Sequence, residues 1–109
     1  MDLIYLFGFS EMTGNHLERL LPIIKAQINK NHRIGFVLIH DGVIGISKKG
    51  KTPKSMVELL DLDITVYALK PDMNARGIAL NQLHDKINAI DYDELVDVLE
   101  STKKVISWI

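Results

Sequence analysis

A continuous apolar run from Ile34 to Ile39 indicates the fold class of this chain. In an antiparallel sheet a strand commonly alternates apolar and polar residues, because one face meets water. A strand that is apolar along its whole length is covered on both faces, as in parallel sheets flanked by helices. The run is also far shorter than the roughly 20 residues that a membrane-spanning helix needs. The sequence therefore predicts a central strand of a parallel α/β sheet.

Strand-like and helix-like segments alternate along the chain, which is the pattern of such a sheet. The predicted strands are Leu3 to Phe9, Ile34 to Ile39, Ile64 to Leu69, Ile87 to Ile90 and Lys104 to Trp108. The predicted helices are Asn15 to Lys30, Pro53 to Leu60, a short helix from Pro71 to Gly77, and one from Asp91 to about Ser101. The 109 residues fit one domain. We expect a single α/β domain over residues 1–109, with a flavodoxin-like or Rossmann-like sheet of about five mostly parallel strands and helices on both faces.

Several residues predict where helices begin. Pro22 lies inside the first predicted helix, so this helix either starts late, with Pro22 in its first turn, or is kinked. Thr52 is predicted to be the N-cap of the second helix, with Pro53 at its first helical position. Asp91, followed three residues later by Glu94, has the form of a capping box. The last helix is expected to bury Leu95, Val98 and Leu99.

The composition excludes several kinds of function. The formal net charge is −1, so no overall field draws the chain to nucleic acid or to an anionic membrane. The absence of cysteine removes disulfides, thiolate metal sites and cysteine nucleophiles. The four histidines lack the spacing of a metal site. The chain starts on an apolar strand with no basic region or cleavage site, which favours a cytoplasmic protein. We expect no membrane contact, no metal and no cofactor.

Polar residues follow three of the predicted strands. In a parallel α/β sheet, ligands and partners are met at the carboxyl ends of the strands. The candidates, in strand order, are Ser10, His40, Asp41, Asp72 and Arg76. The planar guanidinium of Arg76 suits a carboxylate, a phosphate or a group of backbone carbonyls. We predict that these five residues contact a ligand or a partner.

The same residues also have structural interpretations. Neighbouring residues of a strand point to opposite faces, so His40 and Asp41 are poorly placed to form a catalytic dyad. Asp41 and Gly42 more simply make a tight turn. Arg76 follows Asp72 by four residues and would pair with it on one face of a short helix. The loop from Gly8 to Asn15 is either an anion cradle before a helix or an ordinary connection with Asn15 as N-cap.

A basic cluster lies between the second and third predicted strands. Its members are Lys48, Lys49, Lys51 and Lys54. Such a patch can touch phosphate, but no aromatic residue is interleaved for base stacking. A solvated loop is the simpler interpretation.

Three sequence blocks occur in the order of a known family. The first is Leu38 to Val43, a predicted strand followed by a D-G-V turn. The second is Val66 to Leu69 with Asp72 and the Ala75-Arg76-Gly77 block, and the third is Ile90-Asp91-Tyr92, which leads to a helix and a chain that stops near Trp108. Together they resemble the DsrH/TusB family, the small subunit of sulfur-relay complexes in the wider DsrE superfamily, whose most recognisable motif is similar to the second block.

The resemblance implies a subunit that works with DsrE-like and DsrF-like paralogues, or with copies of itself, in a sulfurtransferase complex. Such complexes pass persulfide sulfur toward 2-thiolation of the tRNA wobble uridine or toward sulfur oxidation. Relay requires a cysteine thiolate that is transiently persulfidated. Some DsrH-type members carry one near the first helix, where this chain reads His16-Leu17-Glu18-Arg19-Leu20. We therefore expect a non-catalytic subunit with no catalytic residue of its own, and a tRNA contact that is at most indirect.

A second hypothesis is a stand-alone, homo-oligomeric domain that binds a small molecule or an anion. Its contacts would be Ser10, His40 and Arg76 in the loops after the first three strands. An independent enzyme ranks lowest, because the sequence presents no set of nucleophile, base and orienting group.

Overall fold

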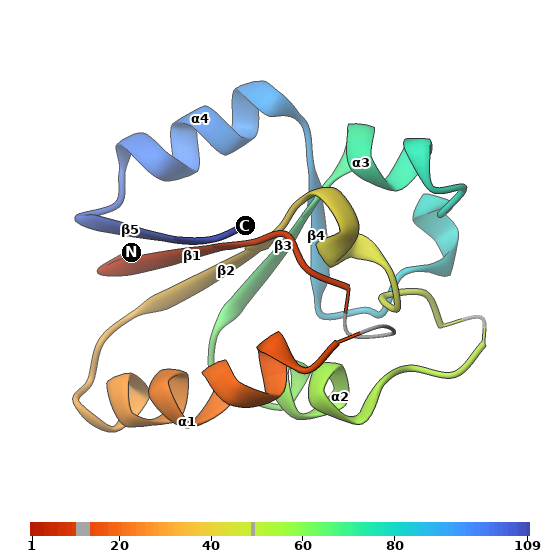
Figure 1. Ribbon diagram of the computed structural model, residues 1–109. Helices are drawn as coiled ribbons and strands as arrows, with labels where there is room; N and C mark the ends of the chain where they lie inside the picture. Colours follow the sequence, from red (N-terminus) through yellow and green to blue (C-terminus); the bar gives the residue numbers. More distant parts are fainter. Residues whose placement is uncertain (11–13, 49) are drawn as a thin grey trace.

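A five-stranded sheet with the strand order β4-β3-β2-β1-β5 forms the centre of the protein (Figure 1). The computed structural model describes residues 1–10, 14–48 and 50–109. The strands are β1 Leu3–Phe7, β2 Ile34–Leu38, β3 Thr65–Leu69, β4 Ile87–Ile90 and β5 Lys104–Trp108. Each strand pairs in parallel with its neighbours. The predicted fold class is confirmed.

The helices lie on both faces of the sheet. They are α1 His16–Asn29, α2 Lys54–Leu60, α3 Lys70–Ala75 and α4 Tyr92–Glu100, with two 3₁₀ turns, η1 His40–Val43 and η2 Leu80–Gln82. Crossovers between parallel strands are right-handed, so the face that a helix covers depends on the direction of its crossover. The connection from β4 to β5 runs back across the whole sheet. It therefore places α4 on the face opposite α1 and α2 (Figure 1).

Each face of the sheet has its own core. Phe36 and Leu38 of β2 belong to the cluster that includes Leu20 of α1 and Met56 of α2. The alternate residue Val37 belongs to the second cluster, against which three side chains of α4 pack: Leu95, Val98 and Leu99. Both sets of β2 side chains are buried, which explains the continuous apolar run. The α4 residues are half-buried rather than fully buried, because their helix lies at the surface.

The ends of several elements differ from the prediction. β1 ends at Phe7, and Pro22 lies inside α1, which begins at His16 and so does not start late. The N-cap of α2 is Pro53 rather than Thr52. The Oγ1 of Thr52 instead lies 2.9 Å from Nε2 of His84, a distant partner that competes for the hydroxyl. None of the helices in the described ranges is long and apolar enough to cross a membrane.

The capping box at the start of α4 is present as predicted. The Asp91 carboxylate accepts the backbone N–H of Glu94 at 2.8 Å, and the Glu94 carboxylate accepts the backbone N–H of Asp91 at 3.2 Å. Asp91→Ala is expected to lower the free energy of unfolding by about 1 kcal/mol, because it leaves a helix N–H without an acceptor. Asp93→Ala is the matched control in the same turn and should cost only about 0.3 kcal/mol. Urea unfolding of both variants tests this, and equal losses would contradict a role for the box.

Tyr5 links stability to high pH. Its side chain is 1% exposed, and its hydroxyl donates to Oε1 of Gln27 in α1. Burial raises the pKa of Tyr5, an effect that the Gln27 hydrogen bond only partly offsets. The folded state therefore disfavours the phenolate, while the unfolded chain ionises near pH 10.

Stability is thus expected to be complete below about pH 10 and to fall as the pH rises beyond it. Tyr5→Phe should cost about 1 kcal/mol at neutral pH through the lost hydrogen bond, and it should reduce the decline at high pH. Urea unfolding across the alkaline range measures both effects. An unchanged alkaline decline in the variant would show that Tyr5 is not its source.

Candidate functional site

Four of the five predicted residues meet at the carboxyl ends of β2 and β3. The guanidinium of Arg76 donates through Nε and Nη2 to Oδ1 of Asp41, at 3.1 and 2.9 Å. Its Nη1 donates to the backbone carbonyl of Asp72 at 3.1 Å and lies 3.9 Å from that residue's Oδ1. The Oδ2 of Asp72 accepts the backbone N–H of His40 at 2.7 Å. We call these four residues the Arg76 cluster.

The cluster joins two short elements that follow neighbouring strands. η1 begins at His40, one residue beyond the end of β2, and α3 begins directly after β3 with Pro71 in its first turn. Arg76 caps the end of α3, and Gly77 follows with a φ of 69°, a left-handed conformation that glycine adopts without steric cost. His40 has a φ of 49°, which is uncommon for a residue with a side chain. Its hydrogen bond to Asp72 helps to hold that backbone conformation.

Gly42 allows η1 to lie directly against the end of β1. A Cβ atom at this position would lie 2.2 Å from the carbonyl oxygen of Phe7. No side chain fits in that space. The sequence feature interpreted as an Asp41-Gly42 turn is thus also a point of close backbone approach.

The charge balance of the cluster favours a structural clamp over an anion site. One guanidinium faces two carboxylates, and donors on all three nitrogens of Arg76 are engaged. The Arg76 side chain is only 27% exposed. The predicted pairing of Arg76 with Asp72 is present at 3.9 Å, but the carboxylate of Asp41 lies closer to the guanidinium, at 2.9 Å. An incoming anion would have to compete with both carboxylates.

The hydrogen bonds described above for the Arg76 cluster do not involve the side chain of His40, nor do they include Ser10. The side chain of His40 is exposed, and the carboxylate of the adjacent Asp41 is held by Arg76. The hydrogen bonds of the cluster involve the backbone of His40, so they do not describe a His-Asp dyad. Ser10 is half-buried in the loop after β1, and the contacts given above join only the other four residues.

The segments that follow β1 and β5 are in close contact where the strand order reverses. This reversal lies between β1 and β5, where open α/β sheets usually bind ligands. Here the backbone N–H of Gly8 donates to the carbonyl of Trp108 at 2.9 Å. A Cβ on Gly8 would lie 2.9 Å from the Ile109 side chain, so the two segments are in close contact. The predicted residues instead lie over the neighbouring strands β2 and β3.

The sequence did not predict the contacts that hold the lysine-rich connection between η1 and α2 in place. Ser47 forms an isolated antiparallel bridge with Leu83, and Lys48 pairs with Asp85 at 2.6 Å. Lys48 lowers the pKa of Asp85 below its usual value. These partners come from the segment before β4, far along the chain, so no local pattern could have indicated them. A hollow of about 290 Å³ lies beside this connection and is lined by Ile44, Gly45, Ser47, Gly50, Lys51, Arg76 and Ile78.

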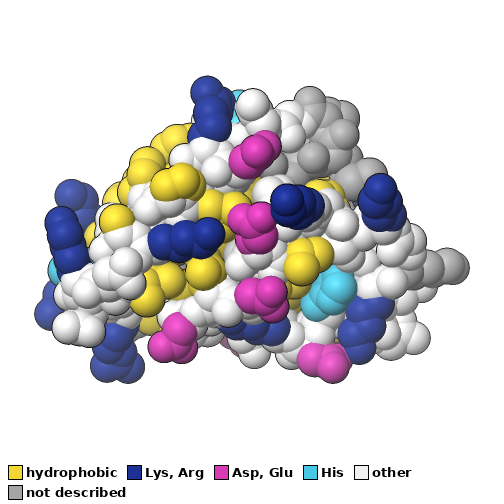
Figure 2. Space-filling model, turned by 90° about the horizontal axis from the view of Figure 1, so that it is seen from below, with side chains coloured by type: hydrophobic (Ala, Val, Ile, Leu, Met, Phe, Trp, Pro, Cys, Tyr) yellow, Lys and Arg dark blue, Asp and Glu magenta, His cyan; other side chains and the backbone are white. Residues whose placement is uncertain are grey.

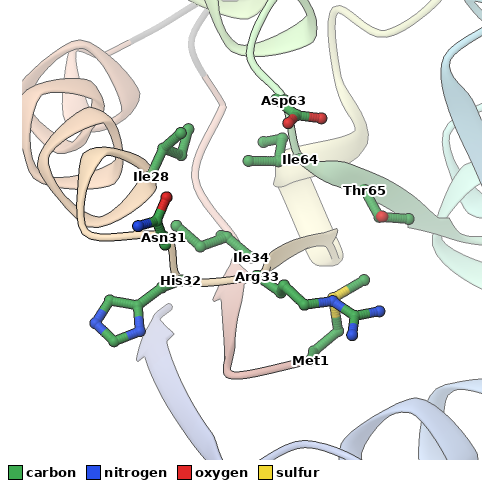
Figure 3. A pocket seen from close by; sticks show the side chains of 9 residues that line it. All are labelled: Met1, Ile28, Asn31, His32, Arg33, Ile34, Asp63, Ile64 and Thr65. Atoms are coloured by element: carbon green, nitrogen blue, oxygen red, sulfur yellow. The ribbon is translucent and has the colours of Figure 1, made fainter.

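A larger hollow, of about 410 Å³, lies at the amino ends of β2 and β3, opposite the Arg76 cluster. Ile28, Ile34 and Ile64 provide its apolar lining (Figure 3). The side chains of His32 and Arg33 at its rim point to opposite sides (Figure 3). Its polar groups do not converge on one point, so its size alone indicates no chemistry. The described residues contain no group of three or more acidic, histidine or cysteine side chains placed to hold a metal ion.

Comparison with known proteins gives two kinds of similarity. In sequence, the DsrH-like protein family matches residues 10–105. Protein TusB of Salmonella arizonae is 35% identical over 72 residues, which span 66% of this chain and 72% of that protein. The TusB proteins of Salmonella newport and Salmonella agona match equally well.

In structure, the ychN protein of E. coli superposes with a TM-score of 0.80 at 20% identity, over 99% of each chain. MTH1491 of Methanobacterium thermoautotrophicum gives a TM-score of 0.65 at 12% identity, over 95% of this chain and 99% of that one. These structural similarities establish the fold, and the sequence matches establish the family. The chain therefore belongs to the DsrH-like family.

Proposed function

We propose that this chain is a non-catalytic subunit of a sulfur-relay complex. Membership of the DsrH-like family supports a place in such a complex. We infer that the subunit is non-catalytic because none of its 109 residues is a cysteine. Persulfide relay needs a thiolate that attacks the donor and then holds the transferred sulfur, and no other side chain of this chain can do both. The sulfur must pass through a cysteine of another subunit.

The partners we propose are DsrE-like and DsrF-like paralogues that carry such a cysteine. The Arg76 cluster supports this role because it fixes the positions of η1 and α3 at one edge of the sheet. Arg76 already makes its hydrogen bonds and ion pairs within the chain. It therefore holds η1 and α3 in place as a pre-formed surface and does not act as a reactive group. Surfaces that need no rearrangement bind partners at a lower entropic cost.

The complex we propose acts in the cytoplasm, and its destination is 2-thiolation of the tRNA wobble uridine or sulfur oxidation. The TusB names of the matched relatives favour the tRNA branch. The formal net charge of −1 is consistent with a tRNA contact that is at most indirect.

The alternative of a stand-alone small-molecule or anion-binding domain has less support. Four of the five predicted contact residues lie over β2 and β3 and not at the strand reversal, where Gly8 and Ile109 are in close contact. Its proposed anion ligand, Arg76, already faces two carboxylates.

Reconstituted sulfur transfer tests the proposal. A cysteine desulfurase, ³⁵S-labelled cysteine, the cysteine-bearing paralogues and a downstream carrier are mixed with and without this chain. We expect label on a paralogue and on the carrier, at least tenfold faster transfer when the chain is present, and no label on the chain in a non-reducing gel. Equal transfer without the chain would refute the subunit role, and stable label on the chain would refute its non-catalytic character.

A further inference from the structure

Asp41 is followed by glycine, a pairing that no other aspartate or asparagine of the 109-residue sequence has. Acidic side chains as such are common on this protein, and Figure 2 shows them interspersed with basic ones over the face that carries α1 and α2. An aspartyl-glycyl pair has its own chemistry, because glycine has no Cβ to shield its backbone nitrogen. That nitrogen can attack the neighbouring side-chain carboxyl group. By its local sequence, Asp41-Gly42 is therefore the pair most prone to isoaspartate formation.

The reaction needs only water and proceeds in two steps. In the first, the backbone nitrogen of Gly42 bonds to Cγ of Asp41, the bond from Cγ to the hydroxyl of the protonated carboxyl group breaks, and the N–H proton leaves with that hydroxyl as water. The product is a cyclic succinimide. In the second, water adds to the main-chain carbonyl carbon of Asp41 and breaks its bond to the Gly42 nitrogen. The main chain then runs through Cβ and Cγ, with no net change in mass.

In the folded chain both reacting groups are held by other partners. Oδ1 of Asp41 accepts Nε and Nη2 of Arg76 at 3.1 and 2.9 Å, so the carboxyl group cannot turn without breaking both hydrogen bonds. The backbone N–H of Gly42 donates to the carbonyl of Ile39 at 2.8 Å. Ring closure would also require the main chain to rotate out of the 3₁₀ conformation of η1.

The close packing of η1 against β1 opposes this rotation. Gly42 is buried, and even one added Cβ would lie 2.2 Å from the carbonyl oxygen of Phe7. The isoaspartyl product has an extra methylene in its main chain and carries its carboxylate directly on Cα, one carbon shorter than an aspartate side chain. The native path of η1 therefore does not accommodate the product, and the shortened acid cannot keep both hydrogen bonds to Arg76.

We propose that Asp41-Gly42 is a latent isoaspartate-forming site, which the hydrogen bonds of Arg76 keep unreacted in the folded chain. Opening of the Arg76 cluster releases the carboxyl group to react, and the product then prevents the cluster from closing again. Arg76 acts here as a positioning residue, through the carboxyl group that it holds. The modification thus removes the contacts that fix η1 to α3. This inference does not depend on the proposed relay function.

The rate of isoaspartate formation at residue 41 tests the proposal in the purified chain, stored at neutral pH and body temperature. Peptide mapping with electron-transfer fragmentation distinguishes the two linkages, and methyl transfer by an isoaspartyl methyltransferase counts them independently. The folded wild-type chain is expected to react at least tenfold more slowly than the same chain unfolded in urea. Arg76→Ala is expected to raise the folded-state rate at least tenfold. Arg76→Lys keeps the charge but not the planar fork, so its rate should lie between the two.

Two control variants separate local opening from a general loss of stability. Asp91→Ala removes the capping box of α4, at a similar expected cost in stability to Arg76→Ala, and should leave the rate at residue 41 unchanged. Asp41→Glu should abolish the signal, because a glutamyl side chain would have to close a larger ring. Equal rates in the folded and unfolded wild-type chain would overturn the inference. A folded Arg76→Ala protein that reacts no faster than wild type, or no faster than Asp91→Ala, would also overturn it.

Discussion

Gly42→Ala is expected to destabilise the protein by about 3 kcal/mol, the upper range for forcing extra atoms into a packed site. The added Cβ would lie 2.2 Å from the Phe7 carbonyl oxygen and 3.1 Å from its carbonyl carbon. Both atoms belong to the backbone of β1, so no side-chain rotation can relieve the contact. η1 would have to move away from β1, and the Arg76 cluster would move with it. Thermal and urea unfolding measure the loss.

Gly77→Ala is the matched control for this substitution. Gly77 has a φ of 69°, and a Cβ there would have no neighbour within 4 Å. The cost should therefore come from backbone conformation alone, about 1 kcal/mol. If Gly42→Ala were no worse than Gly77→Ala, the close approach of η1 to β1 would not limit stability.

Arg76→Ala is expected to weaken binding to the cysteine-bearing paralogue at least tenfold, or about 1.4 kcal/mol. Its removal leaves the carboxylates of Asp41 and Asp72 without the guanidinium that lies against both of them. η1 and α3 are then no longer held together at the surface that we propose as the contact. The fold itself should lose about 1 kcal/mol, since the side chain is partly exposed and solvent screens its ion pairs. Titration of the paralogue, followed by calorimetry, gives the affinity.

Arg76→Lys separates charge from geometry in the same experiment. Lysine keeps the positive charge but cannot donate as a planar fork to Asp41 and to the Asp72 carbonyl. Binding should therefore be only partly restored. If folded Arg76→Ala protein bound the paralogue with unchanged affinity, the contact surface would lie elsewhere, and the cluster would serve stability alone.

The fold was predictable because its strongest signals are local. The apolar run around Phe36 indicates a strand covered on both faces, and the Asp91 capping box marks the start of α4. The error at the start of α2 concerns a residue with a distant partner. Thr52 has the form of an N-cap, but its hydroxyl meets His84. Of the two alternatives for Pro22, the late start is wrong, because α1 begins at His16, and the kink stays a prediction.

The candidate site was predictable in part for a related reason. Ligand-facing residues of parallel sheets lie at the carboxyl ends of the strands, and this places Asp41, Asp72 and Arg76 just beyond neighbouring strands, where the structure joins them. The sequence predicted the pairing of Arg76 with Asp72 but not with Asp41, because Asp41 lies in η1 after a different strand and no local spacing reveals the contact. The contact between Gly8 and Ile109 was also not visible in the sequence, since it depends on how β5 pairs with β1.

The most direct test of the relay proposal is the native mass of the tagged chain from extracts of its own cells, with co-purifying proteins identified. The proposal predicts a complex larger than the 12.3 kDa chain that contains a cysteine-bearing paralogue. Mild reduction should release sulfur from that paralogue and none from this chain. Elution of the chain alone, or only with copies of itself and with no sulfur-handling protein, would contradict the proposal.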